Sequence, residues 1–215
     1  MSNIVKFGNA NLPAATDLAA ALRRNTEAVA GTDGQVIIKM DKTGHWVYGA
    51  DQTLIDPDGR WAVNPASFVK GFIAWGDGEV LAEQMFSAYD RNAPTRDEIP
   101  AAPVGAKRGW EQQLGLSMKC LNGDDEGVEG RFATTSAGGK RSVAELATTV
   151  GKRIKAQMPD TVAVCKLGSS TYQHKTYGRI FVPVFEILEW VTMDGEPAVG
   201  EPAEASGDTG RRRRA

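Results

Sequence analysis

The pattern of hydrophobic and polar positions is most regular in the second half of the chain. Apolar residues alternate with polar ones from Leu114 to Leu121, and the polar segment 122–127 separates them from a second strand-like run, Val128 to Ser136. Alternation with a period of two is typical of a half-buried β-strand. We therefore expect a β-hairpin over residues 114–136.

An amphipathic helix and two strands are expected next. Between Val143 and Ile154, apolar residues recur at three- and four-residue steps, and Ser142 and Glu145 have the spacing of a capping box. These features predict a helix over 142–157. Residues 161–167 alternate again and 179–190 form a longer apolar run, so each segment predicts a strand.

The first half of the chain contains weaker signals. Its candidate elements are a helix over 17–30, strands over 35–40 and 45–48, an aromatic, strand-like segment over 61–75, and a strand over 80–86. Prolines and charged residues dominate 90–109, which predicts an exposed connector.

Together these elements predict a β-rich α+β fold. If one aromatic segment after Trp61 is counted as a strand, the order is three strands, a helix and two strands, which is the order of the oligonucleotide-binding (OB) barrel. We expect an OB-fold-like five-stranded barrel with one helix between strands 3 and 4, plus an N-terminal helix and hairpin extension. Other α+β sheets also contain a strand-strand-helix-strand-strand run. The expected division is an extension over 1–60, an OB-like domain over 61–190 and a tail over 191–215.

Composition narrows the class of protein. A chain of 215 residues with 41% hydrophobic content can bury one good core. No apolar run approaches the roughly 20 residues needed to span a bilayer, and the N-terminus has no apolar signal core, so we expect a cytoplasmic protein without a membrane anchor. Cys120 and Cys165 are far apart without metal-site spacing, which predicts two reduced, buried thiols.

The tail has a composition of its own. Gly, Pro, Ala and acidic residues fill 194–210 with no apolar period, and the arginine run 211–214 follows. Such a segment cannot bury enough surface to offset its chain entropy, so we expect disorder. Acidic tails of many single-stranded DNA-binding proteins recruit partners, and replication or recombination proteins are the partners expected here. The terminal arginines depart from that pattern.

Charge is distributed unevenly along the chain. Residues 51–130 hold 14 acidic and 7 basic residues, whereas 131–180 hold 2 acidic and 9 basic ones, although the net charge of the whole chain is −2. A local positive field can attract phosphates whatever the overall charge. A dipolar protein, or a basic patch that docks an acidic partner, explains the asymmetry equally well.

The basic block ends in an aromatic and cationic stretch, Thr171 to Arg179. It interleaves Tyr172 and Tyr177 with His174, Lys175 and Arg179. Aromatic faces can stack on unpaired bases while neighbouring cations meet phosphates, so this composition is typical of a single-stranded nucleic-acid groove. The alternative is a polar hairpin tip whose tyrosines cover adjacent sheet surface.

A second candidate contact is the run Ser136 to Arg141, which contains two glycines and two cations before the predicted helix. Backbone amides and a helix N-terminus can bind an anion there. The alternative is a flexible glycine turn before a capped helix.

Sequence signatures of enzymes and metal sites are missing. There is no nucleotide-binding glycine motif, phosphate loop, HExxH or GxSxG. The acidic turn 124–126 supplies too few oxygens for calcium, and His45 and His174 have no neighbouring ligands for zinc. We expect no catalysis, no metal and no cofactor.

Two strings resemble poorly characterised bacteriophage and prophage proteins of replication and recombination modules. They are Tyr-x-His-x-x-Tyr-Gly-x-Ile-x-x-Pro-x-Phe-x-Ile, from Tyr172 to Ile187, and the segment Phe132 to Gly139. Over about 61–190 the chain is similar in outline to phage single-stranded DNA-binding proteins with an OB barrel. The resemblance implies sequence-tolerant coating of single strands, without catalysis, in the host cell cytoplasm.

The predicted function is single-stranded DNA binding by phosphate contacts and base stacking. The expected phosphate contacts are Arg131, Lys140, Arg141, Lys166, Lys175 and Arg179, the expected stacking faces are Tyr172, Tyr177 and Phe132, and His174 lies among them. A homo-oligomer is compatible with this prediction. Two other classes stay open: a virion or assembly protein that uses the basic face for subunit contacts, and a metal-dependent nuclease that uses carboxylates between Asp51 and Glu129.

Overall fold

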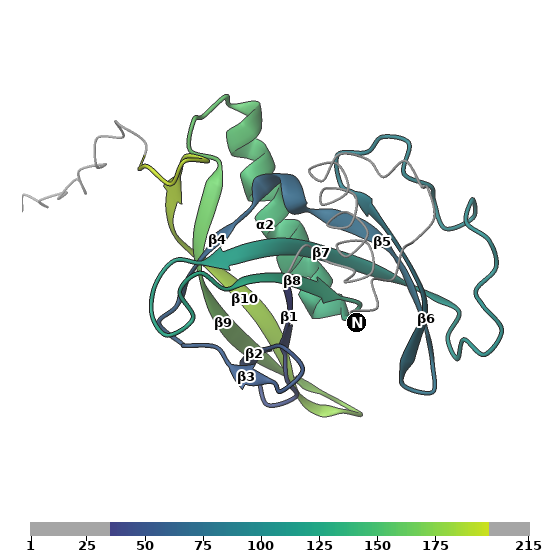
Figure 1. The fold of residues 1–215 in the computed structure, drawn as a ribbon. Helices are drawn as coiled ribbons and strands as arrows, with labels where there is room; N and C mark the ends of the chain where they lie inside the picture. Colours follow the sequence, from purple (N-terminus) through teal and green to yellow (C-terminus); the bar gives the residue numbers. More distant parts are fainter. Residues whose placement is uncertain (1–34, 198–215) are drawn as a thin grey trace, which may run out of the picture.

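The computed structural model describes residues 35–197 (Figure 1). Its strands are β1 (Val36–Met40), β2 (Trp46–Tyr48), β3 (Thr53–Leu54), β4 (Arg60–Val63), β5 (Val69–Gly76), β6 (Glu79–Ser87), β7 (Trp110–Cys120), β8 (Glu129–Thr134), β9 (Val162–His174) and β10 (Gly178–Val191). Its helices are the short 3₁₀ turn η1 (Pro65–Ser67) and α2 (Ala137–Lys155). The predicted helix over 17–30, and the predicted tail from residue 198, lie outside the described residues.

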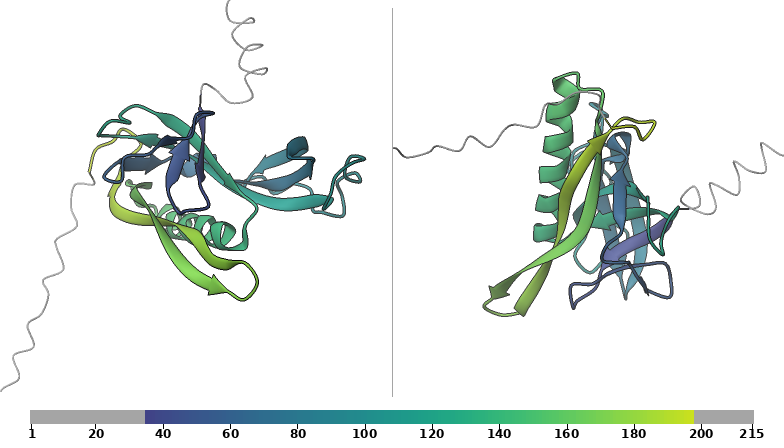
Figure 2. Two further views of the ribbon diagram at one scale, coloured as in Figure 1. Left: turned by 90° about the horizontal axis from the view of Figure 1, so that it is seen from below. Right: turned by 90° about the vertical axis from the view of Figure 1, so that its left-hand side faces the viewer.

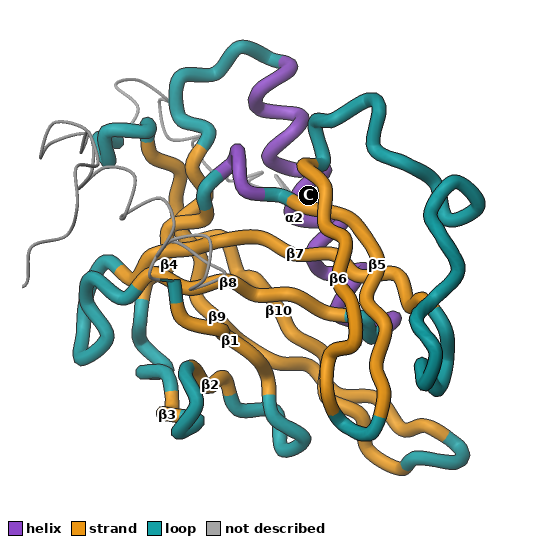
Figure 3. Tube along the Cα trace, turned by 45° about the vertical axis from the view of Figure 1, so that its right-hand side comes forward, coloured by secondary structure: helices purple, strands orange, loops and turns teal. Residues whose placement is uncertain are grey.

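All ten strands belong to one sheet, which curls into a half-barrel around α2. The strand order is β10-β9-β4-β7-β8-β1-β2-β3, and β5 joins through pairing with both β6 and β7. Figure 3 shows the curved strands with α2 behind them. The β-rich α+β class predicted from the sequence is therefore confirmed.

Strand β7 organises the sheet because it pairs with two strands in succession along one edge. Its C-terminal part pairs with β4 (Val63 with Met118), and its N-terminal part pairs with β5 (Val69 with Gly115). The η1 turn joins β4 to β5, and the side chain of Asn64 caps it by accepting a hydrogen bond from the amide of Ala66. The turn redirects the chain between the two pairings.

The core lies between the sheet and the apolar face of α2. The helix buries three apolar side chains, those of Val143, Leu146 and Val150. Their three- and four-residue spacing places them on one face. They belong to the same cluster of buried side chains as Trp61 and Leu116 of the sheet. The helix predicted to be amphipathic thus supplies one wall of the core.

The N-terminal hairpin, predicted as an extension, is part of the main sheet. Strand β1 pairs in parallel with β8 (Ile38 with Phe132), and Ile38 and Trp46 are buried in the shared core. The sequence signal for β1 is local, whereas its partner lies about ninety residues further along, so local alternation could not reveal the pairing.

The connector 90–109 is mostly exposed, as predicted, and it is anchored to the sheet where Ile99 is buried and the indole N–H of Trp110 donates to the carbonyl of Pro100 at 2.9 Å. One boundary differs from the sequence prediction. The helix begins five residues before the predicted start, at Ala137, with Ser136 as its N-cap. Among residues 35–197, no helix has the length and apolar character needed to cross a membrane.

Candidate nucleic-acid interface

The stretch singled out from the sequence forms the end of the β9–β10 hairpin. The two strands pair in antiparallel register from Val162 with Val191 to His174 with Gly178. Side chains of β9 are mostly buried as far as Leu167 and mostly exposed beyond Gly168. The second half of the hairpin therefore projects from the sheet as an arm, as Figure 2 shows. We call residues 169–183 the β9–β10 arm.

The tip of this arm is hydrogen-bonded to the side chain of His174. Its Nδ1 accepts hydrogen bonds from the backbone amides of Thr176, at 3.1 Å, and Tyr177, at 3.3 Å. The ring centroids of His174 and Tyr177 are 4.8 Å apart with an interplanar angle of 30°. Gly178 has φ of +74°, which only glycine adopts without strain. His174 thus positions the tip, and its Nδ1 is already occupied.

Both tyrosines of the arm have ring surface open to solvent. Tyr177 is 75% exposed and Tyr172 is 49% exposed. Lys175 and Arg179 are exposed beside them and make no ion pair within the described part of the chain. The tip therefore combines accessible rings with unpaired positive charge, as the sequence predicted.

A groove of about 500 Å³ separates the start of α2 from this arm. Arg141 and Glu145 line it from the helix, and Tyr172 and Val182 line it from the arm. A Cβ atom on Gly138 would come within 2.8 Å of Val182, so this glycine permits the close approach of helix and arm. The groove brings together a cation and an aromatic ring that are far apart in the sequence.

The electrostatics of the groove favour an anion at its helical end. Arg141 is exposed and makes no ion pair among residues 35–197, and Lys140 precedes it in the first turns of α2. The N-terminus of a helix carries a partial positive charge that adds to theirs. Glu145 is the one carboxylate on the wall, one turn beyond Arg141.

The glycine-rich run before Arg141 is neither an anion-binding loop nor a flexible glycine turn, the two alternatives that the sequence left open. Ser136 accepts a hydrogen bond from the amide of Gly139 at 3.1 Å, and its carbonyl accepts from the amide of Lys140 at 2.9 Å. Residues 137–139 are therefore the first turn of α2, and Ser136 already satisfies one of its amides. Lys140 and Arg141 therefore contribute their positive charge from the surface of the helix and not from a loop.

Sequence reasoning missed the role of Ser142. Its hydroxyl donates to the carbonyls of Pro183, at 2.6 Å, and Gly138, at 3.2 Å, so it ties the helix to the arm. It was assigned as the N-cap because Ser142 and Glu145 have the spacing of a capping box, although Ser136 has the same capping ability. Ser136 is itself a preferred N-cap residue and stands at the end of the strand-like run, directly before the helix, so its position was the signal that could have identified the true cap.

Phe132 was wrongly predicted as a stacking face. It is only 3% exposed, and its ring packs against Trp46, at a centroid distance of 5.1 Å, and Phe185, at 5.7 Å. A base cannot reach a ring buried in this way. The alternation of β8 directs Phe132 inward, so it is a core residue.

Two of the predicted phosphate contacts already have carboxylate partners. The Nζ of Lys166 lies 2.8 Å from Asp58, and the guanidinium of Arg131 lies 3.4 Å from Glu83 of β6. The hydrogen bond from Lys166 lowers the pKa of the Asp58 carboxyl. Neither cation lines the groove beside α2, so we leave both out of the interface.

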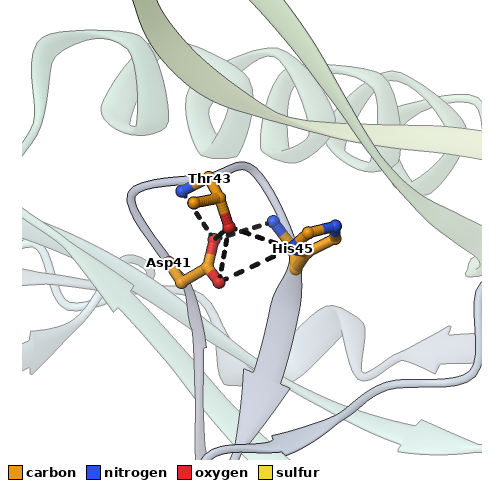
Figure 4. Close-up of polar contacts among 3 residues, drawn as sticks. All are labelled: Asp41, Thr43 and His45. Carbon is orange, nitrogen blue, oxygen red and sulfur yellow. Dashed lines mark hydrogen bonds and ion pairs between the residues drawn. The ribbon is translucent and has the colours of Figure 1, made fainter.

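A polar cluster in the β1–β2 turn contains residue types that also occur in hydrolase sites. The carboxylate of Asp41 accepts hydrogen bonds from the amides of Thr43 and His45 and from the Thr43 hydroxyl, at 2.7 to 2.9 Å (Figure 4). The Thr43 hydroxyl also lies 2.9 Å from Nδ1 of His45. These contacts lower the pKa of Asp41 to about 2, with the hydrogen bond from the Thr43 side chain as the largest cause.

The geometry of this cluster is that of a closed turn. In a catalytic triad the imidazole stands between the carboxylate and the hydroxyl and uses a different ring nitrogen for each. Here Asp41 and Thr43 both approach Nδ1 of His45. Asp41 therefore stabilises the hairpin loop by satisfying its backbone amides. Within residues 35–197 there is also no group of three or more His, Cys, Asp or Glu side chains arranged to hold a metal ion.

Comparisons with known proteins find no relative. No protein-family model matches the chain, no curated protein is similar to it, and no solved structure matches its fold.

Proposed function

We propose that this protein binds single-stranded DNA without base-sequence preference, in the groove between α2 and the β9–β10 arm. The observation that carries the proposal is the meeting of Arg141 and Tyr172 on the two walls of that groove. A phosphate at Arg141 and a base on Tyr172 would be adjacent parts of one strand. Cations beside accessible rings are what sequence-tolerant single-strand binding requires.

Topology gives further support. Within the larger sheet, β4, β7, β8, β9 and β10 can be taken as strands 1 to 5 of an OB-type barrel, and α2 then lies between strands 3 and 4. OB barrels bind oligonucleotides with the face of strands 2 and 3 and with the loops that join strands 1–2 and 4–5. In this assignment the loop between strands 4 and 5 is the tip of the β9–β10 arm. The outer edge of β8 pairs with β1, so the barrel is half open.

The expected contacts follow from exposure and charge. The free cations beside the groove and at the tip, namely Lys140, Arg141, Lys175 and Arg179, would neutralise phosphates, and Tyr172 and Tyr177 would stack on bases. Each stacked base contributes about 1 to 3 kcal/mol. Two such rings with several phosphate contacts are sufficient for micromolar affinity.

The biological setting that we propose is a phage replication or recombination module. It rests on the resemblance of the two strings named above, because the groove itself fits any single strand. In that setting a C-terminal tail would recruit partner proteins.

The test is a fluorescence anisotropy titration of the full chain with labelled oligo(dT) and with a duplex of the same length, at two salt concentrations. We expect binding to oligo(dT) that weakens steeply with salt, since each neutralised phosphate releases counterions. Absent or salt-independent binding would contradict the proposal. Large DNA-independent assemblies in size-exclusion chromatography would favour a virion protein, and magnesium-dependent loss of the labelled strand would favour a nuclease.

A further inference from the structure

A second groove, of about 470 Å³, lies at the β5–β6 hairpin and the start of β7. Phe72, Phe86 and Trp110 line it together with the cations Lys70 and Arg96. None of these residues belongs to the basic block or to the aromatic stretch that the sequence analysis singled out.

Strand register explains why these side chains meet. Residues directly opposite each other in an antiparallel pair project from the same face of the sheet. Lys70 is opposite Phe86 of β6, and Phe72 is opposite Gln112 of β7, two residues after Trp110. Alternation along each strand then places the side chains of all five strand residues on one face, namely Lys70, Phe72, Phe86, Trp110 and Gln112.

Residues 93–96 of the connector form another wall of this groove, beside the strands β5, β6 and β7. Glu98 accepts hydrogen bonds from the amide and hydroxyl of Thr95, at 2.7 and 2.8 Å, and these bonds lower the pKa of Glu98. Trp110 is anchored at its indole N–H by Pro100. The groove is therefore largely preformed, which lowers the entropic cost of binding a ligand.

Exposure separates these rings from the aromatic core. Phe72, Phe86 and Trp110 are each partly accessible, whereas Trp61 and Phe68 are buried. Lys70 and Arg96 are exposed, and neither makes an ion pair within the described part of the chain. Accessible rings between two unpaired cations are suited to a nucleobase with its flanking phosphates.

The place of this groove in the fold suggests a connection with the first one. Figures 1 and 2 show the β5–β6 and β9–β10 hairpins as two arms, with the N-terminal end of α2 near the space between them. In the strand assignment above, the β5–β6 hairpin belongs to the connection between strands 1 and 2. A single strand seated on Tyr172 and Arg141 can therefore continue past the helix toward Trp110.

We infer that this second groove is a base-binding subsite for the same DNA strand, in which Phe72, Phe86 and Trp110 stack on unpaired bases and Lys70 and Arg96 contact the flanking phosphates. The inference rests on the proposed function. Gln112, exposed on the floor, offers an amide donor and acceptor to the edge of a base. The subsite makes affinity depend on the length of the strand.

The experiment measures the affinity of the full-length protein for oligo(dT) of about 4 to about 20 nucleotides. For the wild-type protein, affinity should rise in a step once a strand reaches both grooves. Phe86→Ala should remove that step, with about tenfold weaker binding of long strands. Val80→Ala, on the exposed tip of the same hairpin, is the matched control and should keep it. Circular dichroism checks that both variants fold.

Tryptophan fluorescence provides a second readout. Long oligo(dT) should quench emission in the wild-type protein and in Trp75→Phe, and the quenching should be lost in Trp110→Phe. The subsite is refuted, and the proposed function stands, if three results coincide. Phe86→Ala keeps the length-dependent step, Trp110→Phe keeps the quenching by long oligo(dT), and Arg141→Ala binds oligo(dT) weakly. If the wild-type protein does not bind oligo(dT), both fail. Quenching by an acidic peptide but not by oligo(dT) would assign the groove to a protein partner and overturn the inference.

Discussion

The hydroxyl of Ser142 donates a hydrogen bond of 2.6 Å to the backbone carbonyl of Pro183. This single contact joins the second turn of α2 to the edge strand β10, at the point where the β9–β10 arm leaves the core. Pro183 has no amide to offer, which suits an edge strand, and its carbonyl is satisfied from the helix side. The distance across the candidate groove therefore depends on Ser142.

Ser142→Ala should destabilise the protein by about 1 kcal/mol, because a partly buried carbonyl loses its side-chain donor. Chemical denaturation monitored by circular dichroism measures the change in the free energy of unfolding. Thr148→Ala is the control, since its hydroxyl bonds only to the exposed carbonyl of Ala144 in the same helix. Equal destabilisation by the two variants would show that the hydrogen bond to Pro183 contributes no more to stability than the exposed hydrogen bond within the helix.

Arg141→Ala and Tyr172→Ala should each weaken binding of oligo(dT) by about tenfold, because one removes a phosphate contact and the other a stacking face. Only Arg141→Ala should also reduce the slope of affinity against salt concentration, by about one unit. Lys155→Ala is the control, at the opposite end of α2 and also exposed. A similar loss in Arg141→Ala and Lys155→Ala would point to a diffuse charge effect instead of a groove.

Phe132→Ala should lower the free energy of unfolding by about 3 to 5 kcal/mol, because it removes a buried ring that packs against Trp46 and Phe185. Thermal and denaturant unfolding measure this loss. Phe86→Ala, whose ring is partly exposed, should cost much less. If Phe132→Ala were as stable as the wild-type protein, the placement of Phe132 in the core would be wrong.

Cys120 and Cys165 should not react with a thiol reagent such as DTNB in the folded protein. Both are buried beside Trp61, which is opposite each of them in the sheet. Burial raises the pKa of Cys165 to about 12, and burial is also the largest cause of the raised pKa of Cys120. The thiolate fraction at neutral pH is therefore very small. Both thiols should react after addition of denaturant, and rapid reaction without it would contradict the packing.

Asp41 should make stability depend on pH in the acid range. Its folded-state pKa of about 2 lies below the ordinary value of 3.8, so its contribution is present above about pH 4 and is lost as the pH falls toward 2. The melting temperature of Asp41→Asn should thus lie below that of the wild-type protein at pH 5, and the difference should shrink by pH 2. Asp51→Asn is the control, an exposed carboxyl of the next turn. A difference that does not vary with pH would exclude this linkage.

Local patterns were sufficient for much of the fold. The alternation from Leu114 to Leu121 predicted most of β7, and the spacing from Val143 to Ile154 predicted the buried face of α2. The start of α2 was misplaced, because two residues, Ser136 and Ser142, can both cap a helix. Capping is decided by which amides remain unpaired, and only the folded backbone settles that.

The candidate interface was predictable in part. Exposed rings and free cations at Tyr177 and Lys175 follow from a polar, aromatic sequence at a hairpin tip. The burial of Phe132, and the ion pairs that occupy Arg131 and Lys166, depend on residues more than forty positions away, so no local window contains the information.

The sequence by itself determined the strand-rich class, the helix between two pairs of strands, the buried thiols, and the aromatic and cationic hairpin tip. Each of these features depends on a short run of neighbouring residues. Only the tertiary structure decided that the N-terminal hairpin completes the main sheet and that Arg141 faces Tyr172 across a groove. It also gathered Phe72, Phe86 and Trp110 on one face. The reason is physical: strand register and the curl of a sheet are set by the packing of the whole core, and they bring together side chains that share no local pattern.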